Sequence, residues 1–149
     1  MEAMLAELEG LLIGYNYVVS LHVYCIPYQP QAPIEWYVGE ALGPATVIRE
    51  SGTTTAREIL ADVEVGLRYV GDAKDGGGGP WPSVRYSPRF RELLAGVLAE
   101  LTQAIASATL LGWFELADGL PGVGPVYWGF SYVIVRPDCA IVFIGAGSD

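Results

Sequence analysis

Apolar and polar side chains alternate along residues 15–28, and this period of two predicts a long β-strand. One face of the strand is apolar and consists of Tyr15, Tyr17, Val19, Leu21, Val23 and Cys25. The opposite face is mixed and carries Asn16, Ser20, His22 and Tyr24. The strand therefore offers one face to a hydrophobic core and a second face with polar groups.

A helix is predicted over residues 55–70. Thr55 and Glu58 have the spacing of a capping box, in which each side chain accepts a hydrogen bond from the other residue's backbone amide. Apolar side chains follow at helical spacing and form one stripe: Ala56, Ile59, Val63, Leu67 and Val70. The charged residues, including Asp62, lie outside this stripe.

A second long helix is predicted over residues 88–111. Ser87 and Pro88 are typical of a helix start, and Gly112 is expected to end the helix. The side opposite the apolar stripe carries small residues: Ala95, Ala99, Thr102 and Ala106. A helix whose outer side carries small, uncharged residues is typically covered by other protein on both sides. One prediction is therefore that the chain self-associates through this helix, as in a homodimer.

The remaining periodic segments complete the predicted fold. Residues 2–12 are expected to form a short helix, and residues 34–39 and 45–50 two short strands. Residues 126–135 and 139–146 predict a hairpin whose nearly continuous apolar runs indicate a central place in a sheet. The order of elements predicts a single α+β domain over residues 1–149. Its sheet is mainly antiparallel, and two long amphipathic helices pack on one face.

Charge narrows the classes of partner. The chain has 17 acidic residues, 8 basic residues and a net charge of −9. No nucleic-acid partner is expected, because binding to a phosphate backbone depends on clustered lysine and arginine. A charged partner is expected to be basic. No membrane contact is expected, since no segment reaches 18 consecutive apolar residues.

Compartment and source are inferred from a few residue types. Glu2, Glu7 and Glu9 stand where a signal peptide carries positive charge, so a cytoplasmic location is expected. Cys25 and Cys139 are then expected to be reduced core residues rather than a disulfide. Seven arginines against one lysine, with abundant alanine and glycine, are typical of a GC-rich bacterial genome.

Candidate catalytic groups are few. His22 is the only histidine, and neither a second histidine nor a carboxylate lies beside it, so we expect a hydrogen-bonded side chain on a sheet face. Glycines 76–79 lack the lysine that follows a phosphate-binding loop, and Gly122 and Gly124 lack dinucleotide-binding spacing. The sequence predicts no catalytic residue, no metal site and no cofactor.

Large aromatic side chains near acidic residues are typical of protein–protein contact sites. Trp36, Tyr37 and Trp81 are the predicted anchors of such a site. The acids expected to attract a basic partner are Glu58, Asp62, Asp72 and Asp75. Size and charge resemble, in a general way and without a shared motif, the immunity proteins with which bacteria neutralise their own toxins. A non-enzymatic inhibitor that occludes a basic protein is therefore the first functional expectation.

Two alternatives belong to other classes of function. The first is a small-molecule-binding or hydrolase-like domain, with a pocket between the mixed strand face and a lid formed by residues 71–82. The second is a self-associating structural protein that uses the small-residue side of helix 88–111. His22 belongs to the first alternative, and Ala99 to the second.

Overall fold

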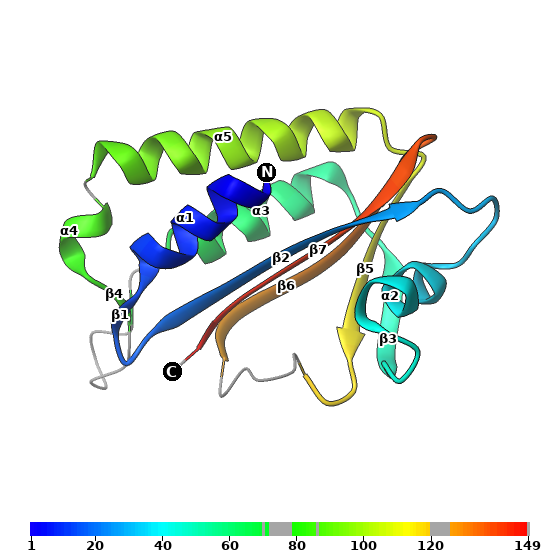
Figure 1. Cartoon of the computed structure of the whole chain (residues 1–149), viewed down its shortest axis with the longest axis horizontal. Coiled ribbons are helices and arrows are strands. Elements are labelled where there is room, and N and C mark those ends of the chain that lie inside the picture. Colours follow the sequence, from blue (N-terminus) through cyan, green and yellow to red (C-terminus); the bar gives the residue numbers. More distant parts are fainter. Residues whose placement is uncertain (70, 72–78, 86, 120–125, 149) are drawn as a thin grey trace.

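The computed structural model contains a five-stranded antiparallel sheet in the order β2–β7–β6–β5–β3 (Figure 1). It describes residues 1–69, 71, 79–85, 87–119 and 126–148. The strands are β2 (Val18–Pro27), β3 (Ile48–Thr53), β5 (Leu110–Leu116), β6 (Val126–Val135) and β7 (Cys139–Ser148). Two short strands, β1 (Gly14–Tyr15) and β4 (Gly79–Pro80), pair separately.

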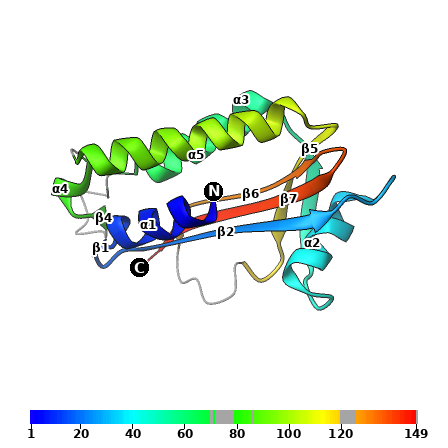
Figure 2. The ribbon, with the colours of Figure 1, turned by 45° about the horizontal axis from the view of Figure 1, so that its top comes forward.

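The helices lie on both faces of the sheet. Helices α1 (Glu2–Leu12), α3 (Ala56–Leu67) and α5 (Pro88–Ala106) cover one face, and α2 (Ile34–Leu42) covers part of the other (Figure 2). The short helix α4 (Pro82–Arg85) precedes α5. The predicted α+β class is confirmed, as is the packing of the two long helices α3 and α5 on one face.

Hydrophobic cores form on both sides of the sheet because β6 and β7 bury alternate side chains on both faces. Leu8, Val63, Val97 and Phe143 represent the larger core, beneath α1, α3 and α5. The smaller core packs α2 against side chains such as Val142 on the other face. The hairpin of β6 and β7 is central in the sheet, as its apolar runs predicted.

The two long helices begin where the capping signals predicted. The Thr55 hydroxyl accepts a hydrogen bond from the Glu58 amide over 3.2 Å, and a Glu58 carboxylate oxygen accepts one from the Thr55 amide over 2.9 Å. Ser87 accepts from the Phe90 amide over 3.0 Å, and Pro88 occupies the first turn of α5. Each cap satisfies an amide that the first turn leaves unpaired.

The prediction of a strand over residues 34–39 is wrong, since these residues begin helix α2. Pro33 precedes the helix, and Gly43 follows it with a φ of 101° that suits glycine. Ile34, Tyr37 and Val38 are buried at the i, i+3, i+4 spacing of a helix. The next strand, predicted over 45–50, is β3 over Ile48–Thr53.

Helix 88–111 was predicted too long, because α5 ends at Ala106. Strand β5 follows over Leu110–Leu116 and was not predicted. Gly112, Phe114 and Leu116 are buried at alternate positions, which is the spacing of a strand. The apolar stripe of the helix continues into residues 108 and 111, which explains why periodicity alone extended it.

The outer edge of the sheet at β2 is bonded by a side chain. The Leu21 amide donates to the Glu9 carboxylate over 2.5 Å, so helix α1 supplies an acceptor to this edge strand. At the opposite edge, the β3–β5 pairing is irregular between Ile48 and Glu50.

Within the described residues, no helix is both long and apolar enough to cross a membrane.

Candidate functional site

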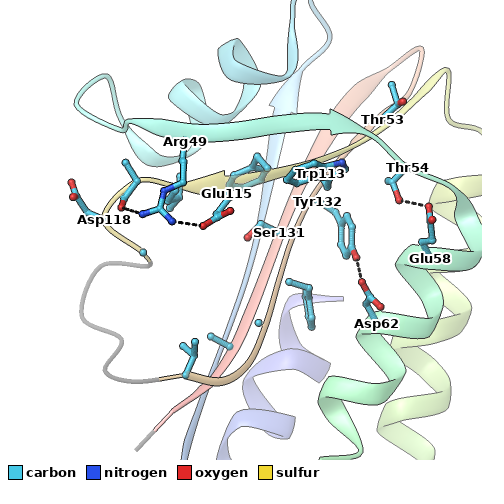
Figure 3. A pocket seen from close by; sticks show the side chains of 18 residues that line it. Arg49, Thr53, Thr54, Glu58, Asp62, Trp113, Glu115, Asp118, Ser131 and Tyr132 are labelled. Atoms are coloured by element: carbon cyan, nitrogen blue, oxygen red, sulfur yellow. Dashed lines mark hydrogen bonds and ion pairs between the residues drawn. The ribbon is translucent and has the colours of Figure 1, made fainter.

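A cleft opens where strands β5 and β6 separate. The two strands pair only between Leu110–Trp113 and Tyr132–Val135. Beyond Trp113, β5 stays paired with β3, whereas the first half of β6 stays paired with β7. The opening between them has a volume of about 940 Å³, and the first half of α3 borders it (Figure 3). The size is that of a ligand or side-chain pocket.

Acidic side chains outnumber basic ones in the described lining of this cleft. Glu58 and Asp62 come from α3, and Glu115 and Asp118 from β5 and the turn after it. Arg49 of β3 is the one basic residue among the described residues that line the cleft. Four carboxylates and one guanidinium give the lining a formal charge of −3 (1 − 4). The cleft therefore favours a cationic ligand.

Asp62 is held in place by a tyrosine of the sheet. The Tyr132 hydroxyl donates to the Asp62 carboxylate over 2.5 Å, as Figure 3 shows. Burial, followed by this hydrogen bond to a carboxylate, raises the pKa of Tyr132 above its ordinary value. Tyr132 therefore remains a neutral donor at physiological pH, and the bond leaves the charge of Asp62 uncompensated.

Glu58 is fixed by neutral donors as well. Its Oε2 atom accepts hydrogen bonds from the Thr54 and Thr55 hydroxyl groups and from the Thr55 amide. The Thr54 hydroxyl is the main cause of a pKa below the usual range for this carboxyl group. Glu58 is consequently ionised and oriented, although its structural task is to cap α3.

Arg49 neutralises negative charge only on the side of the cleft formed by β3 and β5. Its guanidinium lies 2.7 Å from the Glu115 carboxylate and donates to the Ala117 carbonyl over 2.9 Å. These groups are connected by the dashed lines at the left of Figure 3. The negative charge of Glu58 and Asp62 on α3 thus faces no described basic side chain of the cleft.

Aromatic side chains form the wall between the acids. Phe130 and Tyr132 are buried and stack with ring centroids 6.1 Å apart. Trp113 is partly buried, and its indole ring lies so close to Gly52 that a Cβ there would be 2.8 Å from Nε1. Aromatic faces beside carboxylates are a suitable environment for an ammonium or guanidinium group.

The structure brings together two of the predicted contact residues, Glu58 and Asp62. Trp81 is 53% exposed and directly follows β4. Strand β4 lies at the other end of the molecule from β3 (Figure 1). Trp36 is partly buried on α2, on the opposite face of the sheet from α3. Asp72 and Asp75 lie outside the described residues.

Tyr37 does not belong to an exposed contact surface. Its side chain is 1% exposed and packs in the smaller core. Its hydroxyl donates to the Gln29 carbonyl over 2.8 Å and accepts from the Gln29 amide over 3.2 Å. The helical conformation of residues 34–42 explains this burial, because it turns Tyr37 toward the sheet together with Val38.

Several residues of the cleft were not singled out from the sequence, among them Arg49, Trp113 and Tyr132. Each of these three lies on a different strand, and the cleft depends on the separation of β5 from β6. Since β5 was not predicted and its first two residues were assigned to the end of a helix, no sequence signal placed these three side chains together.

A second hollow lies on the mixed face of β2. Its volume is about 460 Å³, and Ser20, His22 and Tyr24 line it as one alternative expected. The Ser20 hydroxyl and His22 Nε2 are 3.1 Å apart. Its other described walls are not the predicted lid of residues 71–82. They are the ends of α2 and β5 with the segments that follow them, including Val47 and Leu116, and Ile144 of β7. Most of the predicted lid lies outside the described residues.

Within the described part of the chain, no group of three or more histidine, cysteine, aspartate or glutamate side chains is arranged to hold a metal ion. No protein-family model, curated protein or solved structure matches the chain. Functional inference therefore rests on the chemistry of the cleft.

Proposed function

We propose that this protein is a non-enzymatic binding protein whose acidic cleft receives a lysine or arginine side chain of a basic partner protein. The observation that carries the proposal is the juxtaposition of two carboxylates, Glu58 and Asp62, with the aromatic wall of Trp113 and Tyr132. All four have fixed positions on α3 and on paired strands. Little side-chain ordering is then required when a partner binds.

The net charge supports the same proposal at longer range. A chain with a net charge of −9 attracts a basic partner during diffusion, which raises the association rate. The cleft then provides the short-range contacts. The finer proposal is that the basic partner is a bacterial toxin, which the protein neutralises by occluding its active surface.

The test compares charge removal inside and outside the cleft. Glu58→Gln with Asp62→Asn removes two charges and keeps both hydrogen-bond acceptors, so the capping box and the Tyr132 bond persist. The matched control, Glu40→Gln with Glu92→Gln, removes two exposed charges from α2 and α5, outside the cleft. Binding of a fluorescently labelled oligoarginine peptide to the full chain is measured by anisotropy at low salt.

The cleft variant is expected to weaken peptide binding about tenfold, and the control by much less. The difference is expected to shrink as salt reduces the Debye length below about 8 Å. Equal losses in both variants would show that only overall charge matters and would refute the cleft as the site.

A separate Trp81→Ala variant is expected to speed dissociation of a protein partner that also covers the end of the molecule near β4.

The finer proposal has its own test. A toxin reading frame directly beside the gene is expected, and the purified protein is expected to inhibit that toxin at a one-to-one ratio. The cleft variant must lose this inhibition while the control variant keeps it. Inhibition by both variants to the same extent would contradict the assignment of the cleft.

The hollow beside His22 supports a second candidate function, the binding of a small, largely apolar molecule. Leu42, Val47, Leu116 and Ile144 supply apolar walls, and His22 supplies a polar group at one side. Val47→Asp is the sharpest variant because this side chain is 60% exposed and contributes little to the core. Indole and phenol serve as probes in thermal-shift titrations, and a wild-type shift that persists in Val47→Asp would place their binding elsewhere.

A further inference from the structure

Two thiol groups lie side by side at the end of β2 and the start of β7. The antiparallel register places Cys25 opposite Ile141 and Pro27 opposite Cys139, so the two cysteines are diagonal neighbours on one face of the sheet. Their sulfur atoms are 3.7 Å apart, and both are free thiols. The helix-covered face carries them at the edge of the larger core.

We propose that Cys25 and Cys139 are a redox-active pair that forms a cross-strand disulfide by exchange with a small disulfide such as oxidised glutathione. The Cys25 thiolate attacks one sulfur of the small disulfide, and the first small thiol leaves. Cys139 then loses its proton and attacks the Cys25 sulfur of the mixed disulfide, and the second small thiol leaves. The protein is oxidised by two electrons, and one small disulfide is reduced to two thiols.

Exposure assigns the order of the two steps. Cys25 is exposed and is accessible to a small disulfide, whereas Cys139 is only partly exposed. Burial, together with its contact to Cys25, raises the pKa of the Cys139 thiol, which makes it the slower thiol toward reagents in solution. Once Cys25 carries the mixed disulfide, the proximity of Cys139 favours the intramolecular step.

Closing the bond requires a small local movement. A disulfide has an S–S length of about 2.05 Å, so the sulfur atoms must approach by about 1.6 Å from their 3.7 Å separation. Cys139 directly follows the turn of Arg136, Pro137 and Asp138, where the Arg136 amide bonds to the Cys139 carbonyl over 2.8 Å. A strand end beside a tight turn can adjust more readily than the centre of the sheet.

The disulfide would connect positions 114 residues apart along the chain. A bridge over so long a loop restricts the unfolded chain strongly and is expected to raise the melting temperature by about 5–15 °C. It would also fix the edge strand β2 to the central hairpin. The inference is independent of the function proposed for the acidic cleft, since neither cysteine lines that cleft.

The test treats the reduced full chain with oxidised glutathione and follows intact mass, peptide mapping and melting temperature. The wild type is expected to lose two hydrogens, yield a Cys25–Cys139 cross-linked peptide and melt at higher temperature, all reversed by dithiothreitol. Cys139→Ser is expected to stop at a glutathione adduct on Cys25. The double variant Cys25→Ser/Cys139→Ser is expected to have the same melting temperature with oxidised glutathione and with dithiothreitol.

Three outcomes would overturn the proposal. One is a wild type that keeps a glutathione adduct on each cysteine, and another is a wild type that forms disulfide-linked dimers. The third is a wild type in which both thiol groups remain free after treatment with oxidised glutathione.

Discussion

The Tyr132 hydroxyl group donates a hydrogen bond to the Asp62 carboxylate across 2.5 Å and thereby joins the sheet to helix α3 at the acidic cleft. Tyr132 is 5% exposed, whereas Asp62 is an exposed residue at the side of the cleft. The same pair positions a negative charge and supports the packing of α3. Substitutions at either residue must therefore be interpreted for stability before they are interpreted for binding.

Removing this hydrogen bond is expected to destabilise the protein. Tyr132→Phe keeps the ring and should lower the free energy of unfolding by about 1 kcal/mol. Asp62→Ala removes the same hydrogen bond and should cost a similar amount, whereas Asp62→Asn keeps an acceptor and should cost less. Urea denaturation of the single variants and of the double variant Tyr132→Phe/Asp62→Ala gives the coupling energy, and a coupling of zero would contradict the bond.

Loss of the α3 cap is the second prediction. Thr55→Ala removes the side chain that accepts from the Glu58 amide and should lower the free energy of unfolding by about 1 kcal/mol. Thr55→Ser retains the hydroxyl group and should remain close to the wild type. If both variants unfold at the same denaturant concentration as the wild type, the cap contributes nothing to stability.

Alkaline pH is expected to destabilise the fold through two tyrosines. Burial is the main cause that raises the pKa of Tyr17 to about 12, and it also raises that of Tyr132. The folded chain therefore holds these protons more tightly than the unfolded chain, whose tyrosines ionise near pH 10. Their contribution to stability is complete below pH 10 and is lost as the pH rises toward 12.

Denaturant titrations between pH 8 and pH 11, with tyrosinate absorbance recorded in parallel, measure this loss. Tyr17→Phe and Tyr132→Phe should each make the fall in unfolding free energy less steep. A fall that is equally steep in both variants would assign the alkaline transition to other groups.

Two glycines of the central hairpin provide a matched test of packing. A Cβ on Gly145 would lie 2.3 Å from Cζ of Phe130, whereas a Cβ on Gly129 would meet nothing closer than 3.5 Å. Gly145→Ala is expected to lower the free energy of unfolding by about 1–3 kcal/mol, as overpacked cores do. Gly129→Ala should change it little, and equal effects in thermal denaturation would show that Phe130 moves aside freely.

His22→Ala is expected to leave binding of the basic peptide unchanged. His22 is exposed on the mixed face of β2 and does not line the acidic cleft. The substitution should instead affect the binding of small apolar probes in the hollow that His22 lines. Loss of peptide binding with an unchanged melting temperature would move the partner site to this face.

The sequence predicted the elements whose signals are local. The capping residues Thr55 and Ser87 mark the starts of α3 and α5. The alternation along residues 15–28 predicted β2, but the strand begins only at Val18, because Asn16 has a φ of 47° and turns the chain after Tyr15 of β1. The prediction of a strand over residues 34–39 was wrong because a short apolar run fits both a strand and one turn of a helix. Packing of its buried side chains in the smaller core stabilises this segment as helix α2.

The candidate site could be predicted only in part. Glu58 and Asp62 share a helix, so their proximity follows from sequence spacing. Tyr132 lies 70 residues from Asp62, and Arg49 lies 66 residues from Glu115. Such pairs depend on strand order and register, and the strand that carries Glu115 was not predicted.

The hydrogen bond from the Leu21 amide to Glu9 affects how this molecule meets other copies of itself. An open edge strand is a template for strand addition, and continued addition leads to aggregation and fibrils. A carboxylate on this edge occupies one amide and repels an approaching acidic strand. The irregular pairing of β3 with β5 perturbs the opposite edge. Each edge of the sheet therefore carries a feature that opposes strand addition, and at the β2 edge helix α1 supplies it.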